Sequence, residues 1–350
     1  MTISIYNTCA LEQLRRELRF DPGQLRQLHN DLLKRFMSDE RALSRFPAKH
    51  RVAGHALALY HQCDSHLDGA TKLLFRTVSS GMLIESVILR IATGRTTLCV
   101  SSQVGCAAAC EFCATGKMGI AQNLSADEIL DQVLQAGQLL MSEGRRVRNI
   151  VFMGMGEPFH NEENLYAALD ALVAPTLFHH PPTKILVSTV GIPEAMIRCA
   201  RRFSEVNLAL SLHSVRSEVR QRLIPLAAKY PLDQLRETLE EVNRLQRRPV
   251  MIEYLLLRGV NDGEDDARAL IDWLEGLSVH VNLIPYNRIE DAPQLEGTLR
   301  PQRDAFAARL KQSGMPTTIR YSLGSDIAAA CGQLVKKENR LIAKPYLQTG

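Results

Sequence analysis

Three cysteines, Cys106, Cys110 and Cys113, lie within one stretch of eight residues. A loop this short can direct three thiolates at one centre. A structural zinc site takes four protein ligands, and an electron-transfer iron–sulfur cluster takes four cysteines, in the ferredoxins with a different spacing. Three ligands on a four-iron cluster would leave one iron free to hold a substrate or cofactor. The alternatives are a chance grouping of thiols or a zinc site completed by Cys99 or another cysteine.

The spacing Cys-x3-Cys-x2-Cys, with Phe112 before the last cysteine, resembles the signature of the radical S-adenosylmethionine (SAM) superfamily. In that superfamily the open iron of a 4Fe-4S cluster chelates SAM, and an electron from the cluster splits SAM into methionine and a 5′-deoxyadenosyl radical. The run from Gly154 to Pro158 (Gly-Met-Gly-Glu-Pro) follows an apolar segment. Alone it is more often a plain turn, but after the cysteines it resembles the element that binds the methionine part of SAM, and the Glu157 carboxylate could accept the SAM ammonium.

Two distant cysteines narrow the resemblance. Cys99 lies in Thr-Leu-Cys-Val-Ser-Ser-Gln-Val-Gly, seven residues before Cys106, and Cys331 lies in Asp-Ile-Ala-Ala-Ala-Cys-Gly-Gln-Leu. Each alone would pass as a small buried hydrophobe. With the cysteine loop, these contexts resemble the RlmN/Cfr family of radical SAM RNA adenine methyltransferases. The resemblance extends from about residue 85 to 334 and is poor over residues 1–70.

The resemblance implies a role for each matching residue. Cys331 would carry the methyl group as S-methylcysteine, and Cys99 would resolve the covalent protein–RNA intermediate through a transient disulfide with Cys331. Glu85 would be the proton acceptor, although its spacing alone favours a solvent-facing strand residue. The Cys331 loop should be flexible, with Gly324 and Gly332 permitting movement. The implied SAM contacts are Gly156, Glu157, Ser188, Ser211, Leu212, His213 and Asn287, and the implied cluster ligands are Cys106, Cys110 and Cys113 with SAM on the open iron.

The same resemblance implies a substrate and partners. We expect methylation of an RNA adenosine at C2 or C8, in 23S rRNA and with tRNA as a second substrate. We also expect an electron donor such as flavodoxin or ferredoxin and a monomeric enzyme. The sequence around Cys99 is similar to the C2 branch, whereas residues 113–116, 177–178 and 188–192 are closer to the C8 branch. Two alternatives stay open: a radical SAM enzyme using the same cysteines on a non-RNA substrate, and a non-enzymatic zinc-binding RNA protein.

Six strand–helix units must position these residues. The expected strands are 96–101, 149–153, 184–189, 207–212, 250–257 and 279–285, with helices at 125–141, 161–173, 193–203, 231–246 and 264–275. Continuous apolar strands separated by helices indicate a parallel sheet covered by helices. Six units favour a partial (βα)6 barrel of the TIM-like, radical SAM type, and the polar candidates come at strand carboxyl ends, where such folds bind ligands.

The remaining chain divides into an N-terminal and a C-terminal part. Residues 1–92 are expected to form an accessory domain, mainly helical to about residue 62, with a hairpin over 71–78 and 82–91 that turns around Ser79 to Gly81. Residues 93–300 would be the core, and 301–350 an extension carrying Cys331. Residues 1–51 hold ten Lys or Arg against six Asp or Glu, while the rest is balanced. This excess is either an RNA-binding surface or a solvated basic face.

Composition sets the cellular context that we expect. The chain has 350 residues and eight cysteines, with no visible secretory signal. No apolar run approaches the roughly 18 residues of a membrane span. Eight cysteines without a signal favour a reducing compartment, and so the cytoplasm, with metal or redox chemistry. Cys9, Cys63 and Cys199 match no motif and are expected to be structural.

Overall fold

The computed structural model describes residues 2–78, 80–119 and 121–334 and is organised around one ten-stranded sheet. From its centre to one edge the sheet contains parallel strands in chain order. These strands are β6 Thr96–Val100, β9 Asn149–Phe152, β10 Ile185–Thr189, β11 Asn207–Ser211, β12 Val250–Leu256, β13 Val279–Pro285 and β14 Thr317–Ile319. All six strands of the predicted partial barrel are present, which confirms the α/β fold class.

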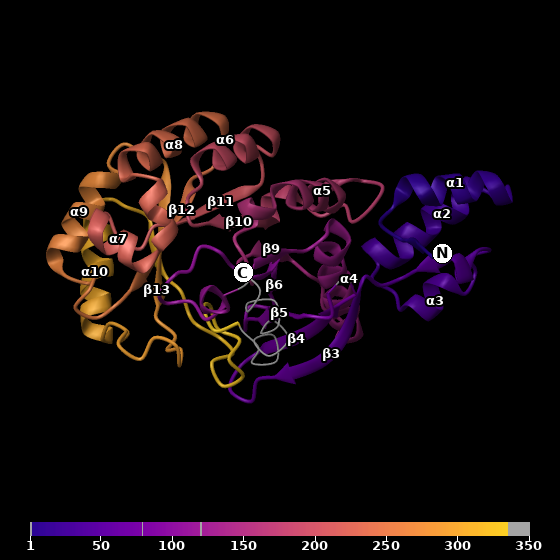
Figure 1. Cartoon of the computed structure of the whole chain (residues 1–350), viewed down its shortest axis with the longest axis horizontal. Helices are drawn as coiled ribbons and strands as arrows, with labels where there is room; N and C mark the ends of the chain where they lie inside the picture. Colours follow the sequence, from indigo (N-terminus) through magenta and orange to yellow (C-terminus); the bar gives the residue numbers. More distant parts are fainter. Residues whose placement is uncertain (1, 79, 120, 335–350) are drawn as a thin grey trace, which may run out of the picture.

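Helices between these strands form an outer arc around the sheet (Figure 1). They are α4 Ala126–Ser142, α5 Glu162–Val173, α6 Pro193–Arg202, α8 Leu232–Leu245, α9 Glu264–Leu274 and α10 Arg300–Gln312. A capping box opens α4, since the Ser125 hydroxyl accepts from the Glu128 backbone N–H at 3.2 Å and the Glu128 carboxylate accepts from the Ser125 N–H at 2.9 Å. Because helices cover the sheet, strands such as β9 are buried almost throughout, which explains their continuous apolar sequences.

Several short elements were not predicted. They are the antiparallel pair β7 Gln103–Gly105 and β8 Ala121–Asn123, the helix α7 Ser217–Leu223, the π-helical turn η1 Asn30–Lys34, and the 3₁₀ turns η2 Lys49–Arg51, η3 Thr115–Lys117, η4 Pro158–Asn161, η5 Pro182–Lys184 and η6 Pro225–Lys229. The pair β7–β8 brackets the cysteine loop and closes it at its base.

Helices α1 Thr8–Leu18, α2 Pro22–His29 and α3 Asp39–Leu43 form the N-terminal part, at the right in Figure 1. Pro22 begins α2, a position that suits its fixed φ, and the Asp21 side chain caps the helix by accepting from the Gly23 N–H. The prediction of helix up to residue 62 is wrong. The chain instead forms β2 Val52–Ala53, which pairs with β1 Ile3–Ser4, and then the edge strand β3 Leu57–Asp64. Strand β3 is exposed along most of its length, so it lacks the alternation that marks a strand, and its pairing with β4 stabilises it.

The predicted hairpin is present as β4 Ala70–Thr77 and β5 Leu83–Arg90, paired antiparallel; Ser79 in its turn lies outside the described residues. Strand β5 also pairs with β6, so β3, β4 and β5 extend the barrel sheet instead of forming a sheet of their own. The domain boundary near residue 92 stays a prediction, as does that at 300, and residues 335–350 of the predicted extension lie outside the described range. The pairing fixes Glu85 on β5 relative to Cys99 on β6.

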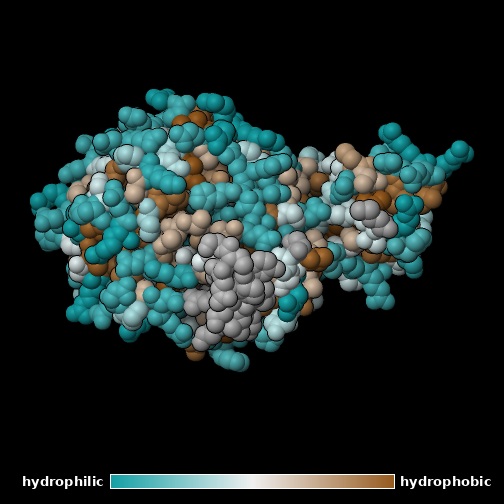
Figure 2. All heavy atoms as spheres, viewed as in Figure 1, coloured by the Kyte–Doolittle hydropathy of each residue, from teal (hydrophilic) through white to brown (hydrophobic). Residues whose placement is uncertain are grey.

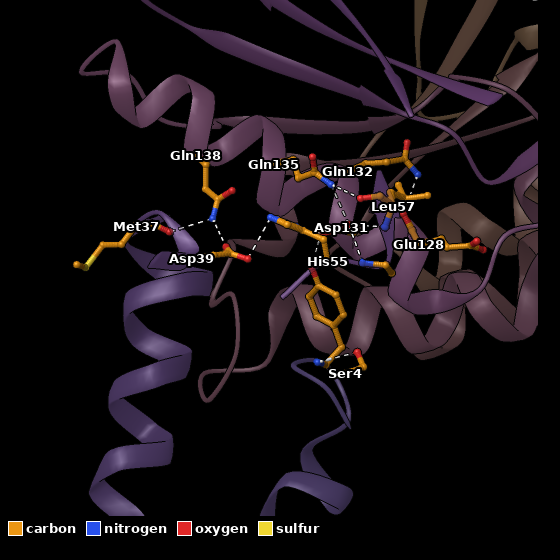
Figure 3. A network of polar contacts seen from close by, with 12 residues as sticks. Ser4, Met37, Asp39, His55, Leu57, Glu128, Asp131, Gln132, Gln135 and Gln138 are labelled. Carbon is orange, nitrogen blue, oxygen red and sulfur yellow. Dashed lines mark hydrogen bonds and ion pairs between the residues drawn. The ribbon is translucent and has the colours of Figure 1, made fainter. Parts of the chain in front are cut away.

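The buried carboxylate of Asp131 on α4 joins the N-terminal part to the barrel (Figure 3). It accepts hydrogen bonds from the Tyr6 hydroxyl at 3.0 Å and from the backbone N–H groups of Ala56 and Leu57 at 2.9 and 2.8 Å. The His55 ring lies 2.8 Å from the same carboxylate. Hydrogen bonds from several elements to one buried anion give this joint a defined geometry.

The surface in the view of Figure 2 is mainly hydrophilic, with hydrophobic atoms scattered between. Among the described residues, no helix combines the length and the apolar character needed to cross a bilayer.

Candidate active site

The three loop cysteines line one pocket at the carboxyl ends of the barrel strands. The loop folds back through a left-handed Ala109, with φ of 54°. A Cβ at Gly116 would lie 2.9 Å from the Cys110 backbone nitrogen, so only glycine fits that close approach. Side chains of α7 and of the ends of β12 and β13 surround the loop in a separate apolar cluster, which includes Leu223, Leu255 and Ile284. The structure therefore brings the three predicted ligands together.

Burial raises the pKa of all three loop thiols, to about 12 for Cys106 and well above the usual range for Cys110. Without a metal they are therefore protonated at neutral pH, and metal binding must release protons. In the described part of the chain, no group of three or more His, Cys, Asp or Glu side chains converges on a single metal ion. Three thiols around one buried pocket would supply three cysteine ligands to an iron–sulfur cluster.

Arg220 on α7 is a buried cation beside the cysteine loop. Its guanidinium donates to the backbone carbonyls of Ser211 at 2.8 Å and Val190 at 2.6 Å, and also to that of Leu212. Burial lowers its pKa to about 10, and the nearby Cys110 opposes this shift. Arg220 is thus still charged at neutral pH, where it fixes the ends of β10 and β11 and places positive charge near the thiolates. Because α7 was not predicted, sequence reasoning missed it.

Most of the predicted SAM contacts line the same pocket, namely Gly156, Glu157, Ser188, Ser211 and His213. Gly156 has φ of 102°, and a Cβ there would lie 2.6 Å from the Gln103 Cβ. Two predicted contacts are placed differently. Leu212 is buried behind the pocket, and the Asn287 amide donates to the Cys331 carbonyl at 3.2 Å.

Glu157 is a buried carboxylate held by backbone donors. It accepts from the Phe159 N–H at 3.1 Å and the Val190 N–H at 2.8 Å. Burial nevertheless raises its pKa to about 7, against the lowering effect of these hydrogen bonds. Near neutral pH the carboxylate is therefore only partly ionised, and a bound ammonium group would favour its ionised form.

Replacing Glu157 with glutamine is expected to weaken SAM binding about tenfold or more, because a hydrogen bond to a charged group contributes about 1.5–3 kcal/mol. In the predicted role the ionised carboxylate binds the ammonium of SAM, so wild-type affinity should rise as pH increases through about 7, and this rise should vanish in the variant. Calorimetric titration of the reconstituted protein with SAM at several pH values tests both effects. Glu162→Gln, outside the pocket, is the control; equal affinities and equal pH slopes in Glu157→Gln and wild type would contradict the role.

His213 is a neutral donor in the pocket. Burial and the Arg220 charge lower its pKa to about 3, and its Nδ1 accepts from the Leu255 N–H at 3.0 Å. A neutral ring that accepts at Nδ1 carries its proton on Nε2. Phe112 packs edge-on against the ring, with centroids 4.8 Å apart. The predicted SAM contact is therefore held in one orientation and one tautomer.

Cys99 and Cys331 line a second, smaller cavity together, and Cys331 also lines the main pocket. Both are free thiols, so the structure does not contain the predicted disulfide. The Gly332 carbonyl accepts from the Ala114 N–H at 2.7 Å, which ties the Cys331 segment to the cysteine loop. Gly324 and Gly332 have φ of 75° and 85°, conformations that favour glycine; the expected flexibility of the segment stays a prediction.

Arg320, just after β14, lies beside both of these cysteines. Its guanidinium is 3.9 Å from the Glu253 carboxylate and 3.5 Å from the Met153 sulfur. Burial raises the pKa of the Cys99 thiol to about 12, as does Cys331, whereas Arg320 lowers it. The charge of Cys331 is in turn the main cause of a raised pKa for Arg320. Arg320 is thus the cation that favours the thiolate form of Cys99, and its position at a strand end was the signal that sequence reasoning did not use.

Glu85 shares one face of the sheet with Cys99, since Val87 lies opposite Cys99 and Glu85 is two residues further along β5. Its carboxylate is buried and lies 3.7 Å from the Lys72 ammonium. The interpretation of Glu85 as a solvent-facing residue is therefore wrong, and its role as a proton acceptor stays a prediction.

The other three cysteines lie apart from the site. Cys199 is buried in the core on α6, as a structural cysteine should be, and Cys63 is half-buried on β3. Cys9 is exposed on α1, so packing does not explain it.

Comparison with known proteins identifies the family. The model of the radical SAM superfamily matches residues 100–274. A "probable RNA methyltransferase" of Rhodopirellula baltica is 59% identical over 339 residues, covering 97% of this chain and 89% of the relative. A "probable dual-specificity RNA methyltransferase RlmN" of Thermus thermophilus is 44% identical over 283 residues, covering 81% of this chain and 79% of the relative. The chain belongs to the RlmN/Cfr family of radical SAM proteins.

The crystal structure of a radical SAM methyltransferase from Sphaerobacter thermophilus agrees with this assignment. It matches with a TM-score of 0.89 at 36% identity, covering 95% of this chain and 99% of that one. Membership of the RlmN/Cfr family implies a 4Fe-4S cluster and SAM as cofactors. The pocket with three thiols, Glu157 and His213 has the donors that these two groups require.

Proposed function

We infer that this RlmN/Cfr family member is a SAM-dependent RNA methyltransferase that modifies an adenosine by radical chemistry, and we propose that it acts at C2 or C8 through S-methyl-Cys331. The observation that carries the proposal is the position of Cys331. Its side chain lines both the pocket of the loop cysteines and the cavity of Cys99. A single thiol can therefore meet a methyl donor on one side and a resolving thiol on the other.

When bound, the cluster and SAM supply a methyl group and a carbon radical that can remove hydrogen from it. We propose that Cys106, Cys110 and Cys113 hold the cluster, while Glu157 binds the SAM ammonium and Gly156, Ser188, Ser211 and His213 surround the rest. Leu212 would act from behind the pocket, through the backbone that Arg220 fixes. Asn287 would act through the Cys331 carbonyl that it binds.

Cys331 first accepts the methyl group, and loss of one hydrogen atom leaves a methylene radical on its sulfur. This carbon adds to the electron-poor adenine carbon, which joins protein and RNA covalently. Glu85 then removes the ring proton. Cys99 attacks the Cys331 sulfur, so that an S–S bond forms, the S–CH2 bond breaks and the methylene takes up a proton. Overall, one proton and one electron leave, and the electron would return to the cluster. A donor such as flavodoxin or ferredoxin would supply the electron for SAM cleavage, and an external dithiol reduces the disulfide.

Large-subunit rRNA, with tRNA as a second possibility, is the substrate that we propose. The N-terminal part supports an RNA-binding role because Arg35, Arg41 and Arg45 line one pocket there, beside the joint with α4. We also propose that the enzyme acts as a monomer.

Replacing Arg35, Arg41 and Arg45 together by glutamine is expected to weaken RNA binding, and the salt slope of log K should fall by roughly 0.7–0.9 for each phosphate that the protein no longer neutralises. Fluorescence anisotropy with rRNA and tRNA fragments at several salt concentrations measures both. The control removes the same charge from the end of α8, at Arg244, Arg247 and Arg248. Equal affinity and slope in the two triple variants would show that the basic N-terminal residues do not bind RNA.

The direct test is mass spectrometry of rRNA and tRNA after incubation with reconstituted enzyme and methyl-labelled SAM. Label on an adenine carbon supports the proposal and identifies C2 or C8. Label that reaches Cys331 but neither RNA would overturn the RNA substrate.

A further inference from the structure

The turn between β3 and β4 is hydrogen-bonded to the segment that leads to Cys331. The Ser65 hydroxyl donates to the Asp326 carboxylate at 2.8 Å, and the His66 backbone N–H donates to it at 3.0 Å. The Gly324 N–H donates to the Asp68 carboxylate at 2.8 Å. This hairpin, which the sequence did not predict in full, therefore fixes the path of the segment a few residues before the methyl-carrying cysteine.

Lys72 on β4 makes a further contact with the same segment, in the interior of the protein. Its side chain is only 7% exposed. The ammonium donates to the Ala328 carbonyl at 3.2 Å and lies 3.7 Å from the Glu85 carboxylate, whose side chain is 1% exposed. One buried cation thus touches both the segment before Cys331 and the predicted base.

The strand register explains why these groups meet. Lys72 pairs with Val87 and Leu74 pairs with Glu85, so Lys72 and Glu85 are diagonal neighbours on one face of the sheet. Cys99, opposite Val87, is on that face too. Burying a charge is costly unless a counter-charge and hydrogen bonds compensate. Lys72 and Glu85 compensate each other, and Ala328, with φ of 49°, turns its carbonyl to the ammonium.

We propose that Lys72 is a positioning residue for proton removal, holding Glu85 as a carboxylate in register with the segment that carries Cys331. This inference rests on the proposed function. In the proton transfer, the adenine C–H bond breaks, its electron pair stays on the adenine ring, and an O–H bond forms on Glu85. The Lys72 ammonium keeps Glu85 charged before this step and ties it to the loop that presents the adduct.

The test compares two variants of the reconstituted holoenzyme. Lys72→Gln keeps a donor for the Ala328 carbonyl but has no charge, whereas Lys72→Met loses both. In both variants we expect methyl loading of Cys331 from SAM at the wild-type level and accumulation of the protein–RNA adduct. RNA turnover should be about 10- to 100-fold slower, a smaller loss than the 10²–10⁴-fold effect of removing a general base. Glu85→Gln should accumulate the same adduct, and adding Lys72→Gln to it should slow turnover no further.

Arg76→Met is the matched control, because it removes one cation from the same strand, where the guanidinium donates to the Gly81 carbonyl at 2.9 Å. A purely structural defect would lower methyl loading and adduct together, so that outcome overturns the proposal, as does turnover of Lys72→Gln equal to that of Arg76→Met. Where Lys72→Met does not fold, Lys72→Gln decides. If the wild type itself fails to methylate RNA, the proposed function is wrong and not this inference alone.

Discussion

An enzyme with Cys99 replaced by alanine is expected to remain covalently attached to its RNA after less than a single turnover. Cys99 shares a cavity with Cys331, and both are free thiols. Once the Cys331 methylene has added to the adenine, a second sulfur must attack Cys331 to break the S–CH2 bond. Alanine cannot do so, whereas loading, hydrogen removal and addition do not need Cys99. Denaturing gels with labelled RNA, followed by mass spectrometry of the Cys331 peptide, detect the adduct.

The control for this experiment is Cys199→Ala. Cys199 is also a buried cysteine whose pKa burial raises to about 12, but it lies on α6, away from both cavities. It should turn over like wild type and form no adduct. Sustained, adduct-free turnover by Cys99→Ala would disprove the resolving role.

The environment of Cys99 also explains why a nearby cation is needed to make its thiol reactive. Burial holds the thiol in its protonated form, and Arg320 is the nearby cation that lowers its pKa. The cation that favours the Cys99 thiolate therefore follows β14, at the opposite edge of the sheet from β3. The barrel curvature brings together groups that are more than 200 residues apart in sequence, Cys99 against Arg320 and Cys331.

Periodicity predicted the barrel because its strands are buried on both faces. Each one, such as β12 with Ile252, Tyr254 and Leu256 fully buried, reads as an apolar run bounded by helices. The same reasoning failed at β3, whose residues are mostly exposed and whose strand conformation depends on pairing with β4. Local sequence carries little information about an edge strand that long-range hydrogen bonds stabilise.

The candidate site divides in the same way. The resemblance identified the cysteines and the residues at strand ends, and the structure gathers most of them around one pocket. Lys72, Arg220 and Arg320 were not found, because strand pairing and loop packing, and not a local motif, bring them to their partners. These partners are Glu85, the ends of β10 and β11, and the two-cysteine cavity. A buried cation has no signature until the fold supplies its counter-charge.

Replacing Cys331 by alanine is expected to reduce RNA methylation to background while leaving the iron and sulfide content of the protein unchanged. The loop cysteines sit on their own segment, closed by β7 and β8 and packed by a separate apolar cluster, so the cluster site does not need the Cys331 side chain. Without that sulfur, however, the methyl group has no carrier. Iron and sulfide analysis, absorption spectra and methyl transfer to RNA measure the two effects on one sample.

Cys110→Ala supplies the contrast, since it should lose iron, sulfide and activity together. If Cys331→Ala lost the cluster as well, Cys331 would be a fourth ligand, and the open iron that SAM needs would not exist. Retained methylation by Cys331→Ala would mean that the methyl group reaches RNA without a protein carrier. Loss of methylation with the cluster intact is the result that agrees with the position of Cys331 between the two cavities. There its sulfur can accept the methyl group on one side and be attacked by Cys99 on the other.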